Sequence, residues 1–288
     1  MTKRPSKPTY FEAQRWASFC LKTVDLPQDA ARFLLLGLTG LDQTQLLIHY
    51  RDTLPIADWQ AYQAAIERVV AGEPAQYVLG KAPFYGLALT VNPAVLIPRV
   101  ETEELVDWIL TDSATMTAKQ VLDIGTGSGA IALALKQNQP SWQVTASDIS
   151  AAALAVAQQN AAELQLDVAF YQSDLFAQVP ATKYDVIVSN PPYIATSETS
   201  VMDASVLTYE PQQALFAAND GLAIYEQLAA QVADHLAVNG RLYLEFGYHQ
   251  GPAVQQLFTQ ALPQATVTLR QDMAGHDRML RVINTKKD

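Results

Sequence analysis

The chain has 288 residues, of which 49% are hydrophobic and 17% charged, with 13 glycines and 15 prolines. This length predicts one large or two unequal domains, and the composition excludes collagen-like, low-complexity and wholly disordered chains. The formal net charge is −10. Because residues 1–75 carry eight basic and eight acidic side chains, all of that charge lies in residues 76–288. Such an acidic body argues against direct, stable binding to nucleic acid, where affinity comes from neutralising phosphates.

The single cysteine and the hydropathy pattern bear on the cellular compartment. Cys20 has no second cysteine with which to form an internal disulfide, as is typical of the reducing cytoplasm. No apolar signal-peptide region follows the basic segment 1–10, and no apolar run reaches the roughly 18 residues that a membrane span needs. We therefore expect a cytoplasmic protein without membrane association.

The first 72 residues have the pattern of amphipathic helices. Their apolar residues recur three and four positions apart, which predicts helices over residues 11–23, 27–36, 42–49 and 55–71. Because this segment is neutral and all-helical, we expect residues 1–72 to be an N-terminal domain that docks the substrate. Residues 73–98 are expected to be a hairpin linker of short extended runs, interrupted by Gly80, Pro83 and Gly86.

From residue 99 to residue 288, helices and apolar strands alternate in a third region. The predicted strands cover residues 120–124, 143–147, 167–172, 184–189, 241–246, 266–271 and 279–283. The predicted helices cover residues 101–112, 129–138, 150–164, 221–237 and 249–262. This order predicts the α/β class with a Rossmann-like, mostly parallel seven-stranded sheet, whose last strand is antiparallel because no helix precedes it. The polar segment 195–211 has no clear period and is expected to be a loop near the site.

A glycine-rich loop follows the first of these strands and opens a helix. It consists of Gly125, Thr126, Gly127, Ser128 and Gly129. Glycines at such a place permit a tight turn and bring backbone N–H groups close to a ligand.

Asp148 ends the next strand, 19 residues after Gly129. A carboxylate there is placed to accept hydrogen bonds from both ribose hydroxyls of an adenosine. Strand, glycine loop, helix, strand and acid in this order favour a nucleoside cofactor over a plain glycine turn. The motif alone does not decide which cofactor. Gly125 and Gly127 with Ala130 also fit a dinucleotide pattern, whereas the three loop glycines resemble the S-adenosylmethionine (SAM) loop of class I methyltransferases.

A second motif, Asn190-Pro191-Pro192-Tyr193, directly follows the strand 184–189 and is therefore expected beside the cofactor crevice. The two prolines fix the backbone and remove two donors, which leaves the side-chain oxygen of Asn190 and nearby carbonyls as acceptors. Tyr193 adds an aromatic face. A planar NH₂ group fits this arrangement, with its protons on the acceptors and its plane on the ring.

This arrangement answers a chemical difficulty. An amide or aryl amine nitrogen is a weak nucleophile because its lone pair is delocalised. Fixing both of its protons turns the lone pair toward an electrophilic methyl group and stabilises the positive charge that develops on nitrogen. With a sulfonium leaving group, neither a strong base nor a metal is required, and the four scattered histidines predict no metal site.

Together these motifs resemble the HemK/PrmC family, the release-factor glutamine methyltransferases. Further similar stretches run from residue 74 to the end of the chain, at residues 74–80, 96–99, 101–103, 209–211, 214–216, 220–222, 245–247, 250–251 and 272–278. The resemblance implies a class I SAM-dependent fold over residues 99–288. It also implies N5-methylation of the glutamine in the Gly-Gly-Gln motif of peptide chain release factors, with S-adenosylhomocysteine as the product.

The resemblance also implies roles for individual residues. The loop 125–129, Asp148, Asp174, Leu175 and Asn190 would bind SAM. The motif 190–193 would bind the glutamine amide, with Asn190, Pro191 and Tyr193 acting in catalysis.

Two positions depart from the family pattern. Family members often carry an aromatic residue at the position of Leu175, and Val100 replaces a proline.

Other hypotheses predict different features. An adenine-N6 or guanine-N2 methyltransferase of nucleic acid faces the same chemistry but needs a basic channel, which the acidic body disfavours. A nicotinamide-dependent oxidoreductase leaves the motif 190–193 unexplained, and a non-catalytic adaptor leaves both motifs unexplained. We expect a monomer.

Five further positions have two interpretations each. Arg99, Glu101 and Glu103 either shape the substrate mouth or serve in helix capping and surface charge pairing. Phe84 and Tyr85 either line the methyl-transfer site or pack within the linker.

Overall fold

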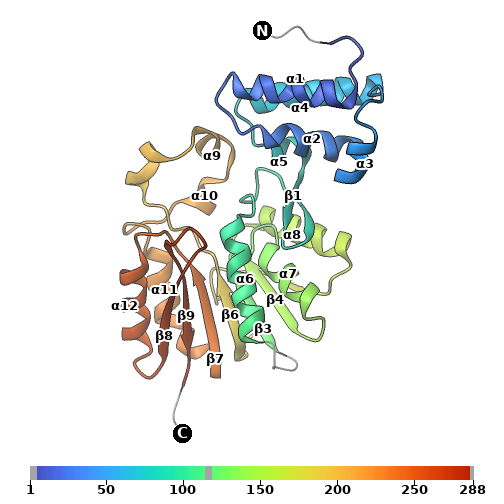
Figure 1. The fold of residues 1–288 in the computed structure, drawn as a ribbon. Helices are drawn as coiled ribbons and strands as arrows, with labels where there is room; N and C mark the ends of the chain where they lie inside the picture. Colours follow the sequence, from blue (N-terminus) through green and yellow to red (C-terminus); the bar gives the residue numbers. More distant parts are fainter. Residues whose placement is uncertain (1–4, 114–118, 286–288) are drawn as a thin grey trace. The chain divides into compact units, whose positions relative to one another are not determined.

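The computed structural model describes residues 5–113 and 119–285 (Figure 1). The chain divides into two compact units, the first made of residues 1–81 and 203–209 and the second of residues 82–202 and 210–288. None of the helices in the described ranges combines the length and the apolarity that a bilayer crossing requires.

The first unit is built from helices. They are α1 Tyr10–Lys22, α2 Asp29–Thr39, α3 Gln43–Ile48, α4 Ile56–Val70, α5 Ala75–Leu79 and α9 Ala204–Tyr209. Capping boxes begin α1 at Thr9 and α3 at Asp42, where each side chain accepts a hydrogen bond from the first turn. The core of the unit contains Trp16 and Trp59, packed edge to face with ring centroids 5.0 Å apart.

The second unit contains a seven-stranded sheet. Its strands are β3 Gln120–Ile124, β4 Gln143–Asp148, β5 Ala169–Gln172, β6 Tyr184–Ser189, β7 Leu236–Glu245, β8 Thr266–Gln271 and β9 Asp277–Ile283. They lie in the order β5-β4-β3-β6-β7-β9-β8, and β9 is antiparallel to both of its neighbours. The hairpin of β1 Lys81–Phe84 and β2 Leu87–Thr90 precedes the sheet in the chain.

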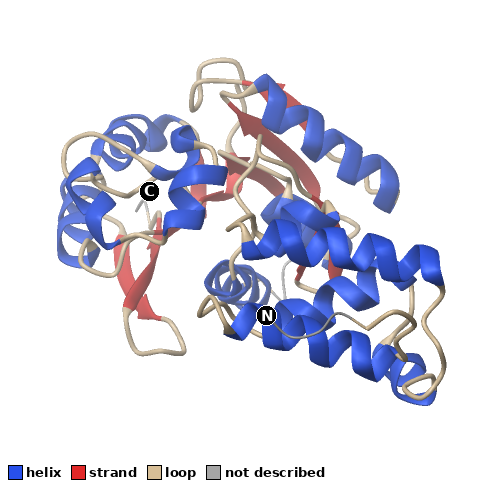
Figure 2. Ribbon diagram, turned by 90° about the horizontal axis from the view of Figure 1, so that it is seen from above, coloured by secondary structure: helices blue, strands red, loops and turns tan. Residues whose placement is uncertain are grey.

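Helices cover both faces of this sheet, as the blue helices and red strands of Figure 2 show. One core contains residues of α6 Val100–Asp112, α7 Ala130–Asn138 and α8 Ala151–Leu164, and the other contains residues of α11 Ala223–Gln231 and α12 Gly251–Ala261. Successive strand residues enter opposite cores, since side chains alternate across a sheet: Val121 packs in the first core and Leu122 in the second.

The order of the strands positions the site. From β3 the chain moves to one side through β4 and β5, and then returns to the other side of β3 with β6. A crevice forms at the carboxyl ends of the strands where the order reverses in this way, and ligands of open α/β sheets bind there. The glycine loop follows β3 and residues 190–193 follow β6, so the topology brings both motifs to that crevice.

The predicted fold class, a mostly parallel seven-stranded sheet after a helical N-terminal region, is confirmed, and the strands at 120–124, 184–189 and 266–271 have the predicted bounds. Three local predictions are wrong. Residues 76–79 are helical in α5, between Pro74 and the left-handed Gly80. The helix expected to reach residue 237 ends earlier, because Leu236 pairs with Tyr184 in the sheet. The segment 195–211 is not a plain loop, since it holds the 3₁₀ helix η1 Thr196–Val201 and α9.

Candidate active site

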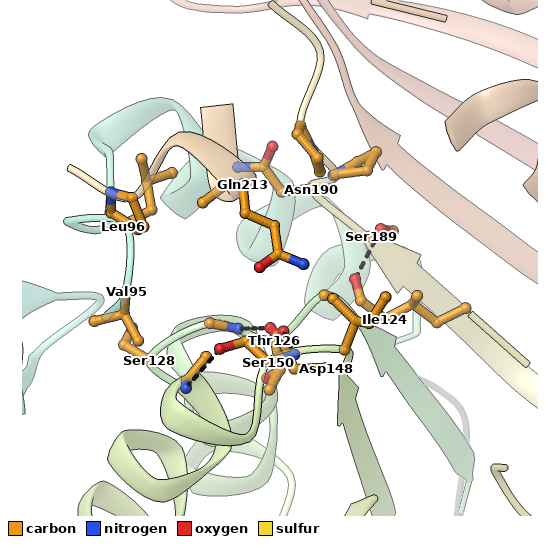
Figure 3. Close-up of a pocket in the computed structure, with 18 of the residues that line it drawn as sticks. Val95, Leu96, Ile124, Thr126, Ser128, Asp148, Ser150, Ser189, Asn190 and Gln213 are labelled. Carbon is orange, nitrogen blue, oxygen red and sulfur yellow. Dashed lines mark hydrogen bonds between the residues drawn. The ribbon is translucent and has the colours of Figure 1, made fainter. Parts of the chain in front are cut away.

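A cavity of about 340 Å³ lies at the carboxyl ends of β3, β4 and β6 (Figure 3). Its lining includes most of the residues predicted for cofactor and substrate binding: Gly125, Thr126, Gly127, Ser128, Asp148, Asp174, Leu175, Asn190, Pro191 and Pro192. Two predicted residues, Gly129 and Tyr193, are not in the lining. The structure thus brings the two motifs together around one hollow.

The glycine loop is held by backbone hydrogen bonds to the neighbouring strand. The N–H groups of Gly125 and Thr126 both donate to the carbonyl of Ser147, at 2.8 and 2.9 Å. Gly125, Gly127 and Gly129 have φ values of +71°, +56° and +83°, in the left-handed region that side chains disfavour. The three glycines are therefore required by the shape of the turn.

Asp123 lies beneath this loop and is fully buried. Its Oδ2 accepts hydrogen bonds from the hydroxyl of Thr126 at 2.6 Å and from the N–H of Ala132 at 3.2 Å, so it joins the loop to α7. Burial raises the pKa of Asp123 to about 7, although both hydrogen bonds oppose the shift.

Asp148 faces the cavity from the end of β4. Its Oδ2 accepts from the N–H of Gly127 at 2.9 Å and its Oδ1 accepts from the N–H of Ser150 at 2.8 Å. Burial raises the pKa of this carboxyl, against the opposing effect of those backbone donors. Because a carboxylate offers about four acceptor positions, Asp148 keeps capacity for further donors from a ligand.

Apolar side chains form the wall around Asp148. Ile149 follows it directly, and Leu175, which comes after β5 and has a positive φ of 46°, also lines the cavity. The hydroxyl of Ser173 donates to the carbonyl of Leu175 at 2.9 Å and holds that backbone in place. The wall therefore suits a flat apolar group and offers no aromatic stacking partner at Leu175.

Asn190 begins the second motif at the end of β6. Its Nδ2 donates to the hydroxyl of Thr102 on α6, at 3.1 Å. Pro191 and Pro192 continue the lining of the cavity.

The segment is held from behind by Gln250. Its Nε2 donates to the carbonyl of Tyr193 at 2.8 Å and to that of Asp220 at 3.1 Å, while its Oε1 accepts from the N–H of Gly247 at 3.0 Å. Gly221 lies so near that a Cβ there would overlap the carbonyl oxygen of Tyr193. The backbone path of the motif thus depends on a glycine and a glutamine far along the chain.

Arg99 lines the cavity and forms an ion pair with Glu210, at 2.5 Å between Nη2 and Oε1. The Glu210 side chain is only 1% exposed, and its other oxygen accepts from the N–H of Ile97 at 3.4 Å. Glu103 instead accepts a hydrogen bond from the N–H of Tyr85 at 2.8 Å and anchors the hairpin turn. The two charged residues therefore differ: Arg99 belongs to the cavity wall and Glu103 to the support of the hairpin.

Glu245, at the end of β7, is 1% exposed and lies behind the motif. Burial raises its pKa to about 7, while hydrogen bonding to Thr102, the charge of Arg278 and hydrogen bonding to Asn190 act in the opposite direction. Burial and the Glu245 charge also raise the pKa of Tyr193 to about 12, which keeps that hydroxyl protonated at neutral pH.

Several residues of this site were not predicted as site residues from the sequence. Gln213, on α10 Gln212–Leu215, extends its amide into the cavity between Asn190 and Thr126 (Figure 3). Thr102 and Glu245 stand in stretches that carry the family resemblance, which was their only sequence signal. Among the apolar lining residues, Phe216 also stands in such a stretch, 214–216, whereas Val95 stands in none.

Comparison with known proteins connects both units to one group of enzymes. Residues 12–80 match the PrmC N-terminal domain family, and residues 102–218 match the methyltransferase small domain family. The release factor glutamine methyltransferase of Streptococcus pneumoniae is 50% identical over 88% of this chain and 91% of its own length. The chain belongs to the release factor glutamine methyltransferase family.

Other comparisons agree with this assignment. The release factor glutamine methyltransferase of Enterococcus faecalis is 43% identical to this protein over 94% of this chain and 97% of its own length. Among solved structures, a methyltransferase from Pyrococcus furiosus matches with a TM-score of 0.51 at 18% identity, over 77% of this chain and 97% of that one. This structural match supports the class I methyltransferase fold.

Proposed function

We propose that this protein transfers a methyl group from SAM to the side-chain amide nitrogen of the glutamine in the Gly-Gly-Gln motif of peptide chain release factors. The observation that carries the proposal is the position of residues 190–193 beside the glycine loop, on one cavity. Family membership supports the choice of a release factor as substrate. Because release factors act on ribosomes, the proposal places the protein in the cytoplasm.

The residues of the cavity fit SAM. Asp148 has free acceptor positions for ribose hydroxyls, and Ile149 and Leu175 offer apolar surface for an adenine. Gly125 and Gly127 leave the neighbouring space clear, since nothing lies within 4 Å of a Cβ added at either position. When bound, SAM supplies an electrophilic methyl group on a sulfonium leaving group.

The acceptor amide is oriented by residues of this chain. Asn190 Oδ1 and a carbonyl of the rigid Pro191-Pro192 segment would accept its two N–H groups, which turns the nitrogen lone pair toward the methyl carbon. The nitrogen forms its bond to that carbon as the carbon–sulfur bond breaks and its electron pair goes to sulfur. The methylated nitrogen then loses one proton to water. Asn190 and the carbonyl stabilise the positive charge while it exists.

The substrate is tested with radiolabelled SAM and four acceptors: a release factor, its Gln→Ala variant in the Gly-Gly-Gln motif, ribosomal RNA and DNA. We expect label in the unmodified release factor alone. Label in RNA or DNA but not in the release factor would instead identify a nucleic-acid amine methyltransferase.

The role of Asn190 is tested by Asn190→Ala. We expect turnover to fall at least roughly 100-fold, as for loss of an oriented group that acts in the transition state. The dissociation constant for SAM, measured by calorimetry, should change much less. An equal loss of SAM affinity would assign Asn190 to cofactor binding instead.

The helical first unit, in this proposal, docks the body of the release factor. Leu47 and Ile48 are 63% and 71% exposed on α3, which leaves an apolar surface open to a protein partner. Leu47→Asp with Ile48→Asp should raise KM for the release factor about tenfold, with SAM affinity unchanged. The matched control is Val238→Asp, at a 57% exposed position of the second unit. An unchanged KM in the double variant would remove this surface from the docking site.

A further inference from the structure

Two strand ends place Glu245 next to Asn190. Parallel strands β6 and β7 pair Ser189 with Leu244. The residues that follow these two in the chain, Asn190 and Glu245, therefore occupy neighbouring positions at the carboxyl edge of the sheet. Thr102 of α6 lies between them and is 5% exposed.

The three side chains form a polar cluster in which Thr102 and Glu245 are buried and Asn190 is half-buried. Asn190 Nδ2 donates to Thr102 Oγ1 at 3.1 Å, and the Glu245 carboxyl lies close enough to both side chains for their hydroxyl and amide groups to lower its pKa, against the larger effect of burial. An ionised carboxylate only accepts hydrogen bonds, so it faces the NH₂ end of an asparagine amide and not the oxygen end.

The burial of Glu245 is not explained by an ion pair. Arg278, whose charge lies near, pairs with Asp272 at 3.2 Å and donates to the carbonyl of Phe246 at 3.2 Å. Glu245 Oε2 has no hydrogen-bond partner within residues 5–113 and 119–285. A buried carboxylate without a salt bridge is destabilising, and a glutamine of the same shape would avoid that cost. The charge at this position therefore points to a role in the site.

We propose that Glu245 is a positioning residue that fixes the amide of Asn190, with its NH₂ held by Glu245 and Thr102 and its Oδ1 left to accept the substrate amide. This inference rests on the proposed function. The carboxylate also polarises the Asn190 amide through a charge-assisted hydrogen bond, which makes Oδ1 a stronger acceptor. Glu245 takes no proton in the reaction, because the proton of the methylated nitrogen goes to water.

The test is Glu245→Gln in the full chain. A glutamine is able to turn its own NH₂ toward Asn190. The Asn190 amide is then no longer held with its oxygen facing the cavity. We expect kcat for release-factor methylation to fall at least roughly 30-fold, with KM and SAM affinity within about threefold of the wild type. The melting temperature should not decrease, since a buried charge is removed.

A pH profile distinguishes positioning from a purely structural role. Groups that face Glu245 from the surrounding elements are Glu101 of α6, Tyr193, Tyr225 of α11 and Arg278 of β9. Since the pKa of Glu245 is about 7, wild-type kcat should decline as the pH falls below that value, and this decline should be absent in the glutamine variant.

A substrate-free measurement keeps the inference separate from the proposed function. The side-chain NH₂ signals of Asn190 in ¹⁵N NMR, assigned by their loss in Asn190→Ala, should shift with pH near 7 in the wild type. In Glu245→Gln they should move and cease to titrate. If the wild type leaves release factors unmethylated, the proposed function fails, whereas unchanged Asn190 signals in the glutamine variant overturn the positioning role.

Two further variants complete the design. Thr102→Val should lower kcat, and Thr102→Ser, which keeps the hydroxyl, should restore most of it. Asp112→Asn is the control: Asp112 accepts from Tyr243 at 2.8 Å and Arg281 at 2.6 Å, away from the cavity lining, so it should affect stability and not kcat. Wild-type kcat and pH profile in Glu245→Gln would refute the proposal.

Discussion

The two walls of the cavity lie at the ends of adjacent strands but are held in different ways. The glycine loop after β3 is fixed by its own neighbourhood, with Gly127 bonded to Asp148 only 21 residues away. The motif after β6 depends on distant parts of the second unit: Asn190 reaches Thr102 across 88 residues, and Tyr193 is held by Gln250 across 57. One wall is a local turn, whereas the other is assembled from the whole unit.

This difference has a functional consequence. Changes far from residues 190–193 in sequence should impair the acceptor wall while leaving the cofactor wall intact. Substitutions at Gly221, Gln250 or Glu245 should therefore reduce turnover more than SAM affinity. Changes within the glycine loop and its strand should do the reverse.

The largest effect is expected from Gly221→Ala. An added Cβ would overlap the carbonyl oxygen of Tyr193 and the amide nitrogen of Gln250, and the φ of +81° disfavours any side chain. We expect a loss of about 1–3 kcal/mol of folding free energy, as for overpacked sites, and a loss of turnover of at least roughly 100-fold. Denaturant unfolding and methylation assays measure the two quantities.

A second glycine provides the control for backbone strain. Gly275 has a φ of +84° but nothing within 4 Å of an added Cβ. Gly275→Ala should therefore cost about 1 kcal/mol and leave turnover unchanged. Similar turnover in both alanine variants would contradict a specific role for the Gly221 contact.

The next effect concerns the cofactor wall. Asp148→Asn leaves one oxygen to serve two backbone donors and removes the charge that a ribose would meet. Loss of charge-assisted hydrogen bonds of about 1.5–3 kcal/mol should weaken SAM binding at least tenfold. Turnover at saturating SAM should change less, in contrast to Asn190→Ala.

Asp185→Asn is the matched control for Asp148. Asp185 also accepts a backbone N–H, from Gln120 at 2.9 Å, but it lies near the start of β6, away from the cavity. Its substitution should leave SAM affinity unchanged. If Asp148→Asn binds SAM as the wild type does, the assignment of Asp148 to the ribose is wrong.

The same contrast explains what the sequence could predict. The strand bounds at β3 and β6 follow from apolar runs that end at Gly125 and Asn190, and the two motifs follow from residue type and spacing. Parallel strands share one carboxyl edge, so the proximity of the motifs could also be predicted.

The support of the acceptor wall could not be predicted in this way. The contacts of Thr102, Gln250 and Gly221 exist only after α6, α12 and the segment before α11 pack on the sheet. No periodicity encodes such contacts. The helix α5 was missed for a related reason: its five residues are too few to show a helical period, and it is fixed by burial of Ala75 and Tyr77.

A smaller effect is expected on the pH dependence of stability. Burial raises the pKa of Asp123 from 3.8 to about 7, so the folded protein holds this proton more tightly than the unfolded chain does. Its contribution to stability is therefore full below pH 3.8 and is lost as the pH rises through about 7. Relative to the wild type, Asp123→Asn should gain stability progressively between pH 4 and pH 7, as measured by denaturant unfolding at each pH. A constant difference across this range would show that the carboxyl does not titrate there.

The smallest effect is expected where this chain departs from its family. Leu175 lines the cavity with a side chain that is 8% exposed, and its positive φ of 46° is already tolerated. Leu175→Phe adds an aromatic face for the adenine, worth about 0.5–1.5 kcal/mol, and should tighten SAM binding by a few-fold at most. Calorimetry with SAM measures the gain, and Leu175→Met, similar in volume and without a ring, controls for packing. Equal affinities in the two variants would show that no base stacks at this position and that the wall recognises the adenine by apolar contact alone.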